Sequence, residues 1–250
     1  MVKTNLESKA TDEQKVKHMG LSKLFQANVM PTNELLISLG LFERTSQLVK
    51  YLFLNELYQL ILDKPGVIME FGCWRGQNLV VFENLRAIYE PFNHTRRIIG
   101  FDTFKGYTQP SEHDTQGEVI REGNYALEEG YKEYLEAILS WHEESNILGN
   151  IKKHEVIAGD VCQTVPQYFV EHLETVVALA YFDMSLYEPT AVCLSVIRNH
   201  LIKGSVLMLD EYGIEEGRGE TQAVRELLAG GHYSMRLSKF MPGRTIAIIE

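Results

Sequence analysis

The residues of this chain best suited to chemistry are six carboxylates, each at or just after a short apolar segment typical of a buried strand. They are Glu70, Asp102, Asp160, Asp183, Asp210 and Glu211. A carboxylate beside buried apolar strands is costly unless a cation or a hydrogen-bond donor meets it. The pattern therefore indicates a site for something cationic, such as a charged cofactor or a divalent metal. For part of the set, the alternative is that surface carboxylates cap helices.

Asp183, Asp210 and Glu211 are the candidate metal ligands. They follow the fourth and fifth predicted strands, so we expect them to converge at neighbouring strand ends. Three hard carboxylate oxygens without a histidine or cysteine partner suit magnesium or calcium better than zinc. A metal there would lower the pKa of a bound hydroxyl and align it for attack. The alternative is that Asp210 and Glu211 merely start a polar loop and that catalysis rests on proximity.

Asp183 is also the candidate catalytic residue, as the base that takes the proton of a hydroxyl group. A carboxylate bound to a cation is a weak base, so an imidazole remains an alternative. Three histidines fall in or near the segment 105–150: His113, His142 and His154. None belongs to a pairing motif, and each can equally be structural or exposed.

The segment EFGCWRG, from Glu70 to Gly76, follows the apolar run Val67 to Met69 and predicts a strand that opens into a tight loop. A dinucleotide-binding loop G-x-G-x-x-G uses its middle glycine to let the backbone approach a pyrophosphate. Trp74 occupies that middle position, which favours a cofactor without a pyrophosphate. The segment resembles the first motif of class I S-adenosylmethionine-dependent methyltransferases. An ordinary α/β turn is the alternative.

This resemblance implies roles for four residues of the loop. Gly72 and Gly76 would let the backbone approach the amino-acid end of S-adenosylmethionine. Glu70 and Arg75 are candidates for its amino and carboxyl groups, although Arg75 can instead be exposed to solvent.

The far end of the cofactor would meet residues after the second and third strands. Asp102 is the candidate for the ribose hydroxyls, because a carboxylate can accept a hydrogen bond from each, and Phe104 would shield the adenine. Asp160, after Gly159, would meet the adenine amine. The alternative for Gly159 and Asp160 is a plain turn at a strand end.

Composition limits the class of partner. The chain has 250 residues and a formal net charge of −10, which disfavours nucleic acid and leaves a small molecule as the expected substrate. Cys73, Cys162 and Cys193 fit neither a disulfide framework nor a zinc site, so we expect a reducing cytoplasm. The polar N-terminal sequence predicts no signal peptide, and no apolar run approaches the ~20 residues of a membrane span.

Strand and helix patterns alternate along most of the chain, which predicts an α/β fold with a doubly wound, mostly parallel sheet of seven strands. The later strands are expected at Ile98–Ile99, Glu155–Ala158, Val176–Phe182, Ser205–Leu209, Tyr233–Leu237 and Thr245–Ile249. The later helices are expected at Leu127–Trp141, from a cap at Thr164 with Pro166 in the first turn, at Pro189–Leu201 closing at Gly204, and at Glu220–Leu228.

Two additions are expected around this sheet, dividing the chain into an N-terminal helical arm at 1–62, packed on the core, and a catalytic domain at 63–250. The helix from Glu43 to Leu62 is apolar on more than one face. It is either a plain core helix or one that also contacts a second subunit. The insertion 105–150 is too long for a simple connection and is either a lid that helps form a binding pocket or flexible surface decoration.

Four segments together resemble the macrocin O-methyltransferase (TylF/MycF-type) family of sugar O-methyltransferases. They are EFGCWRG (70–76), GFDTFKG (100–106), FDMSLYEPT (182–190) and KGSVLMLDEYG (203–213). The resemblance implies a class I fold, S-adenosylmethionine, a divalent metal, usually magnesium, and a sugar hydroxyl as acceptor. That sugar would belong to a glycosylated natural product, as in antibiotic biosynthesis, or to a nucleotide-linked sugar. A homo-oligomer is also implied.

Two departures from the family pattern concern the implied metal ligands Asp183, Asp210 and Glu211. Ser185 stands where the family often has a second aspartate, and Glu211 replaces the second residue of an Asp-Asp pair. Proteins with this fold can have two other functions, which remain alternatives. One is an NAD-dependent oxidoreductase, and the other is a non-catalytic protein that binds S-adenosylmethionine.

Overall fold

The computed structural model describes residues 11–115 and 117–250 and contains one seven-stranded sheet in the order β3-β2-β1-β4-β5-β7-β6. Strands β1 to β5 are parallel, and β7 pairs antiparallel with both β5 and β6. The predicted doubly wound, mostly parallel sheet is confirmed. The strands are β1 (Val67–Phe71), β2 (Ile98–Asp102), β3 (His154–Ala158), β4 (Val177–Phe182), β5 (Leu201–Leu209), β6 (Tyr233–Leu237) and β7 (Thr245–Ile249).

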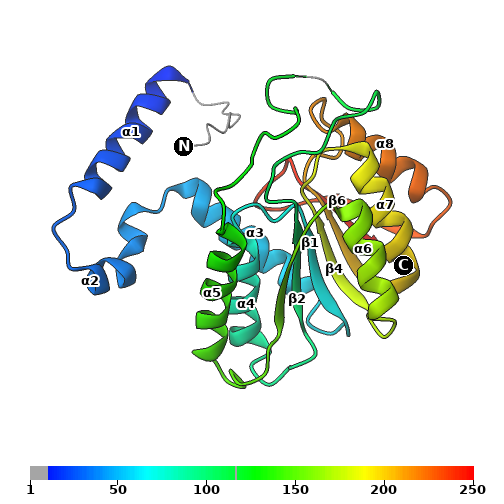
Figure 1. Cartoon of the computed structure of the whole chain (residues 1–250), viewed down its shortest axis with the longest axis horizontal. Coiled ribbons are helices and arrows are strands. Elements are labelled where there is room, and N and C mark those ends of the chain that lie inside the picture. Colours follow the sequence, from blue (N-terminus) through cyan, green and yellow to red (C-terminus); the bar gives the residue numbers. More distant parts are fainter. Residues whose placement is uncertain (1–10, 116) are drawn as a thin grey trace.

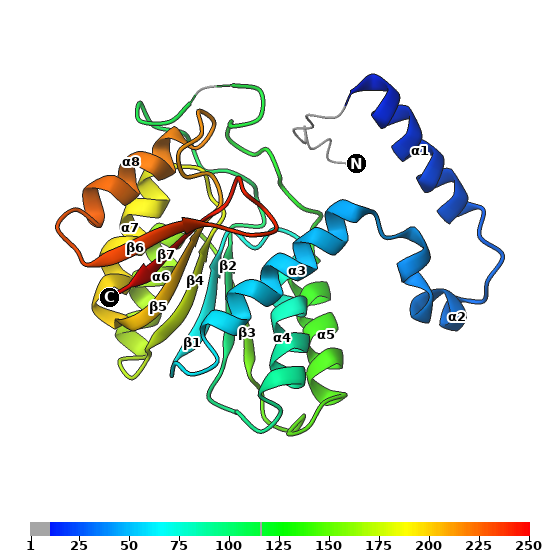
Figure 2. The same ribbon diagram turned by 180° about the vertical axis from the view of Figure 1, so that it is seen from behind.

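Helices cover both faces of the sheet, as Figures 1 and 2 show. Side chains alternate along a strand, so Met69 and Phe71 pack into one apolar layer and Ile68 into the other. Helices α6 (Val161–Glu171), α7 (Tyr187–Ile197) and α8 (Arg218–Leu227) cover the first face. Helices α3 (Thr45–Leu60), α4 (Gln77–Tyr89) and α5 (Tyr131–Glu144) cover the second. Both faces of the central strands are therefore buried, which explains their near-continuous apolar sequences.

Several predicted helix boundaries were wrong, including that of α5, which begins at Tyr131 rather than Leu127. Helix α6 begins at Val161 rather than near Pro166, because the Asp160 carboxylate caps it by accepting a hydrogen bond from the Cys162 amide. Helix α7 ends at Ile197 and a short 3-10 helix, η2 (Arg198–His200), follows it. Gly204 therefore closes no helix but lies within β5, with a positive φ of 90°.

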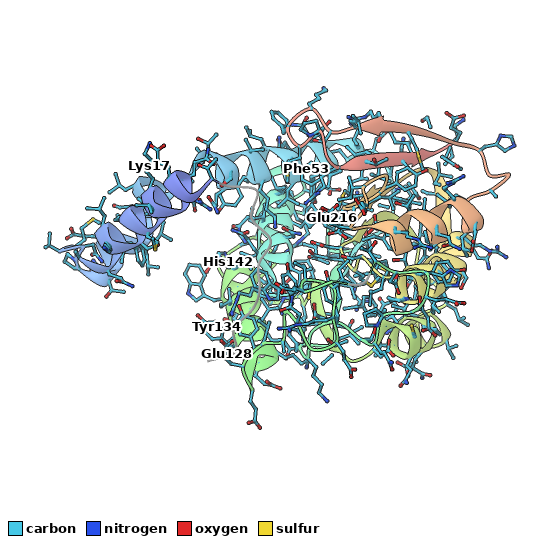
Figure 3. All side chains as sticks on the ribbon, turned by 90° about the horizontal axis from the view of Figure 1, so that it is seen from above. Lys17, Phe53, Glu128, Tyr134, His142 and Glu216 are labelled. Carbon is cyan, nitrogen blue, oxygen red and sulfur yellow. The ribbon has the colours of Figure 1, made fainter. Side chains whose placement is uncertain are left out.

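The N-terminal segment lies largely away from the sheet. Helices α1 (Asp12–Gln26) and α2 (Thr32–Ile37) and the 3-10 helix η1 (Leu39–Phe42) extend sideways from the body, and Figure 3 shows Lys17 of α1 at a distance from it. Neither α2 nor η1 has a buried residue. Only α3 packs into the core, through residues such as Phe53 and Leu57. Residues 1–10 of the predicted arm lie outside the described part.

The insertion after β2 is hydrogen-bonded to the rest of the domain through Asp114. The buried Asp114 carboxylate accepts hydrogen bonds from the Ser111 amide at 2.7 Å and the Tyr187 amide at 2.7 Å, so it occupies the amino end of α7. Gly219 of α8 leaves it room, since a Cβ there would lie 1.9 Å from Asp114 Oδ1. Across the described residues, no helix has the length and apolar character needed to span a membrane.

Candidate active site

The predicted acids after β4 and β5 emerge side by side. Phe182 of β4 pairs with Leu209 of β5, so the next residues, Asp183 and Asp210, leave neighbouring strands at the same level. The Asp183 amide donates to the Phe71 carbonyl of β1 at 3.0 Å, and the Asp210 amide donates to the Phe182 carbonyl at 3.1 Å. Parallel strand order thus brings together residues that are far apart in the sequence.

The loop after β1 lies against the same edge. Gly72 has φ 83°, and a Cβ there would lie 2.2 Å from the Asp183 carbonyl oxygen, so only glycine fits. Gly76, at φ 74°, precedes α4 and faces Leu135. Trp74 adopts a positive φ of 46°, which a residue with a side chain rarely does.

Glu70 and Arg75 differ sharply in their surroundings. Glu70 is buried; its Oε1 accepts from Asn78 Nδ2 at 2.6 Å, while its Oε2 has no hydrogen-bond partner. Burial raises the pKa of Glu70 well above its ordinary value, against the effect of the Lys50 charge. Arg75 is exposed, lies 3.5 Å from Glu128, and stacks over the Trp74 ring. The alternative of an exposed Arg75 matches this position.

Asp102 holds the loop after β1 and the chain after β2 together. Its Oδ2 accepts from the Trp74 amide at 2.7 Å, and its Oδ1 accepts from the Phe104 amide at 2.6 Å. Burial raises its pKa even so. At the next strand end the Gly159 amide donates to the Asp102 carbonyl, and Asp160 caps α6 as described above. These residues line one edge, but Asp160 already has a structural role.

Asp183, Asp210 and Glu211 have unequal surroundings. Asp183 keeps exposed surface, yet protein lies close enough for desolvation to raise its pKa. Asp210 is buried, and desolvation and the Asp183 charge raise its pKa. Its Oδ1 lies 2.6 Å from Arg244 Nε. Glu211 is half-buried, its Oε2 lacks a partner, and desolvation raises its pKa. These three carboxylates lie at one edge of the sheet, and a cation bound there would stabilise their charged forms.

The three predicted ligands are not assembled into a tight cage. Within the described residues, one group of three His, Cys, Asp or Glu side chains has ligand atoms within 4.8 Å of one another, and it consists of Glu83, Glu143 and His154. Two cationic side chains already contact this buried group. Arg86 Nη2 lies 3.5 Å and Lys153 Nζ lies 3.2 Å from Glu143 Oε1. We therefore interpret it as an ion-pair network rather than a metal site.

Two of the three histidines considered as the base, His154 and His142, lie too far from the acids for that role. His154 begins β3 and pairs with Ile98, at the amino ends of the parallel strands, opposite the acids. His142 lies near the end of α5 on the same side, with its ring 3.4 Å from Asn84. His113 stacks on Tyr187 with ring centroids 4.3 Å apart, outside the acidic group.

The comparisons with known proteins agree with this geometry. A sequence model described as Macrocin-O-methyltransferase (TylF) matches residues 54–228. The chain belongs to the macrocin-O-methyltransferase (TylF) family. It is an O-methyltransferase, and the alternative of an NAD-dependent oxidoreductase is wrong. Among curated protein sequences, none matches the chain.

Solved structures give the same assignment. The calicheamicin methyltransferase CalS11 is 40% identical, covers 96% of this chain and 94% of its own, and superposes with a TM-score of 0.92. An apo structure of CalS11, described as a TDP-rhamnose 3'-O-methyltransferase, is 38% identical over 96% of each chain, with a TM-score of 0.84. The O-methyltransferase NovP, at 15% identity over 78% of each chain and a TM-score of 0.56, supports the fold alone.

The departure at Ser185 from the TylF family pattern has a visible structural counterpart. Ser185 has φ 61°, and its Oγ lies 2.9 Å from the hydroxyl of Tyr107, which comes from the insertion. The Ser185 side chain also lies close enough to Glu211 to lower the pKa of that carboxyl group. A serine at this position thus links the insertion to one of the candidate metal ligands.

Sequence reasoning missed four residues that belong to this site. Lys50 of α3 acts on Glu70, Asp183 and Asp210 as a nearby positive charge. The other three are Arg244, Tyr107 and Glu220, whose Oε1 accepts from the Glu211 amide at 3.1 Å. Glu220, in an amphipathic helix, was the most detectable of these, because a charged residue on an apolar helix face needs a partner.

Proposed function

We propose that this enzyme transfers the methyl group of S-adenosylmethionine to a hydroxyl group of a sugar, assisted by a divalent metal ion. The sugar is nucleotide-linked or part of a glycosylated natural product. The observation that carries the proposal is the convergence of Asp183 and Asp210, from neighbouring strands, against the glycine loop that begins at Gly72. The similarity to CalS11, described as acting on TDP-rhamnose, supports the sugar acceptor.

The chain offers complementary groups to each part of the cofactor. The unpartnered Oε2 of Glu70 is suited to accept a hydrogen bond from the methionyl ammonium group. Asp102 uses one lone pair of each oxygen for backbone amides, which leaves others for the two ribose hydroxyls. Phe104 is half-buried beside it and is assigned to the adenine. Asp160, already a helix cap, keeps its second oxygen for the adenine amine.

The donor set after β4 and β5 fits a hard divalent cation such as magnesium. Its oxygens belong to Asp183, Asp210 and Glu211, and Glu211 Oε2 is buried without a partner. Arg244 now neutralises part of Asp210, so metal binding would require that ion pair to loosen. When bound, the ion would stabilise the alkoxide form of the sugar hydroxyl. Asp183, which is exposed at the strand end, would accept the proton that methyl transfer from sulfur to oxygen releases.

Chelation tests the metal requirement. After treatment with EDTA, methyl transfer to TDP-rhamnose should fall to background and recover on addition of magnesium. Asp210→Asn should remain inactive in magnesium, whereas Asp63→Asn, which alters an exposed carboxylate before β1, should match the wild type. Full turnover in the chelated enzyme, or an Asp210→Asn variant as active as the wild type, would reject the metal.

We also propose a homo-oligomer in which α3 contributes to a subunit contact. Its inner face is buried, but Leu48 and Leu52 are 50% and 46% exposed. Beyond α3, Ile37 of α2 is 87% exposed. Apolar side chains gathered on a projecting segment favour contact with a second subunit.

A further inference from the structure

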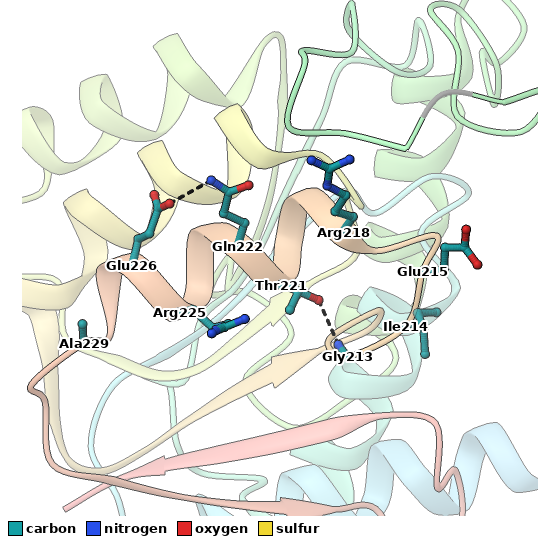
Figure 4. Close-up of a pocket in the computed structure, with 9 residues that line it drawn as sticks. All are labelled: Gly213, Ile214, Glu215, Arg218, Thr221, Gln222, Arg225, Glu226 and Ala229. Carbon is teal, nitrogen blue, oxygen red and sulfur yellow. Dashed lines mark hydrogen bonds between the residues drawn. The ribbon is translucent and has the colours of Figure 1, made fainter.

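A pocket lies along helix α8, beyond the acids that follow β5. It has a volume of about 860 Å³ and is lined by the loop residues Gly213 and Ile214 and by α8, as Figure 4 shows. The Gly213 amide donates to Thr221 Oγ1 at 2.9 Å, which fixes the loop against the helix. Pockets of ~300–1,000 Å³ are the usual size for small-molecule ligands.

Two arginines line this pocket, and their charges are unpaired within the described residues. Arg218 and Arg225 are seven residues apart on α8, about 10.5 Å along the axis, and both line the pocket, with their side chains extending to different sides of α8 in Figure 4. Within the described residues, neither guanidinium has an ion pair or a hydrogen-bond acceptor. By contrast, the guanidinium group of Arg96 is paired with Glu90 and that of Arg244 with Asp210.

The acidic residues of the pocket do not neutralise this pair. Glu226 accepts hydrogen bonds from the Tyr187 hydroxyl at 2.6 Å and from Gln222 Nε2 at 2.8 Å, and these bonds lower its pKa. Its carboxylate is therefore committed to neutral donors. The Glu215 side chain extends away from α8 in Figure 4. Both arginines remain available to an anionic ligand.

The pocket starts next to the candidate metal ligands. Gly217, just before α8, packs so closely on Glu211 that a Cβ would lie 2.1 Å from the Glu211 carbonyl oxygen. Glu220 of α8 accepts from the Glu211 amide. The start of α8, which lines the pocket, is therefore in direct contact with the segment that carries Glu211.

We propose that Arg218 and Arg225 bind the diphosphate of a nucleotide-linked sugar, so that the sugar ring lies over Asp183 and the nucleoside extends along α8. This assignment rests on the proposed function and selects one of its two acceptor classes. A diphosphate is repelled by the acids at the strand ends and needs fixed cations beyond them. Arginine suits it, since its planar group donates two parallel hydrogen bonds to phosphate oxygens. An uncharged glycosylated scaffold would give these cations no partner.

Binding of thymidine diphosphate, measured by calorimetry in EDTA so that no metal bridges it, tests the pocket directly. Wild-type enzyme should bind it and should not bind thymidine, which lacks the phosphates. Arg218→Ala with Arg225→Ala should weaken binding about 100-fold, roughly tenfold for each charge-assisted contact. Arg198→Ala, which removes an exposed arginine at the opposite edge, should bind normally. Equal binding to wild type and double variant, or none to wild type, would overturn the assignment.

Kinetics separate this assignment from the proposed function. With TDP-rhamnose, the double variant should show a raised KM and wild-type affinity for S-adenosylhomocysteine. The wild type should prefer TDP-rhamnose to methyl rhamnoside, and equal kcat/KM for the two acceptors would refute the diphosphate site. If the wild type methylates neither acceptor, rhamnose is rejected as the acceptor sugar, and thymidine diphosphate binding alone decides on the pocket.

Discussion

Replacing Asp102 by asparagine should weaken both the fold of the loop and the affinity for the cofactor. The two side chains have the same shape, but an amide offers one acceptor oxygen where the carboxylate offers two. Both oxygens of Asp102 accept backbone hydrogen bonds, from Trp74 at 2.7 Å and from Phe104 at 2.6 Å. In the variant, the amide NH₂ must face one of these N–H donors, so one hydrogen bond is lost and two donors meet.

The size of the effect follows from that geometry. A hydrogen bond to a charged group contributes ~1.5–3 kcal/mol, which for a protein of this length corresponds to a decrease in Tm of roughly 3–12 °C. Losing one acceptor for the ribose costs a similar amount in binding, or roughly 10- to 150-fold in the Kd for S-adenosylhomocysteine. Asp102→Asn should therefore remain folded, but with a lower Tm and weaker cofactor binding.

Thermal unfolding with and without S-adenosylhomocysteine, together with calorimetric titration, separates the two effects. Glu155→Gln is the matched control, because it removes a half-buried carboxylate from the neighbouring strand β3 and should leave binding intact. Wild-type affinity in Asp102→Asn would refute the ribose assignment. An unchanged Tm without ligand would refute the idea that the carboxylate holds the two loops.

Three further changes have expected outcomes. Arg96→Ala removes a buried guanidinium that donates to three backbone carbonyls and to Glu90, so chemical denaturation should show that the free energy of unfolding falls by ~3–5 kcal/mol. Arg97→Ala, the control, should lower it by at most ~1 kcal/mol, and equal losses in the two variants would contradict this reasoning. Burial, then repulsion from Glu143, raises the pKa of Glu83 from 4.5 to about 8, so the folded state binds the extra proton and loses stability as pH rises across that interval. Glu83→Gln should thus have a higher Tm than the wild type at about pH 9 and little advantage at about pH 5, and a pH-independent difference would refute this. Sedimentation should give a particle heavier than the 28.6 kDa chain, and a monomer at working concentration would rule out the contact through α3.

The sheet and its acids could be predicted because both leave local signals. A buried strand such as Val177–Phe182 is a continuous apolar run, and the carboxylate that ends it interrupts that run abruptly. Parallel topology then requires that such ends meet at one edge. Asp183 and Asp210 were placed together on this basis, and β4 and β5 are neighbours in the sheet.

The cations of the site could not be predicted in this way. Lys50 is on helix α3, which precedes the first strand, and Arg244 is in the turn that precedes the last strand, β7. Nothing in their sequence neighbourhoods distinguishes them from surface residues, because their partners are supplied by tertiary packing alone. The backbone conformation of Trp74 was equally hidden, since a positive φ at a tryptophan contradicts the local preference and is imposed by its surroundings.

The position of Asp114 constrains how the insertion can open. Its carboxylate satisfies the Tyr187 amide at the start of α7, so any motion that lifts this part of the insertion also exposes a helix terminus. Loop opening and fraying of α7 are thus one thermodynamic event, and the amide protons of both should exchange with solvent at a common rate. Any opening of this part of the insertion therefore depends on the stability of that helix end as much as on the loop itself.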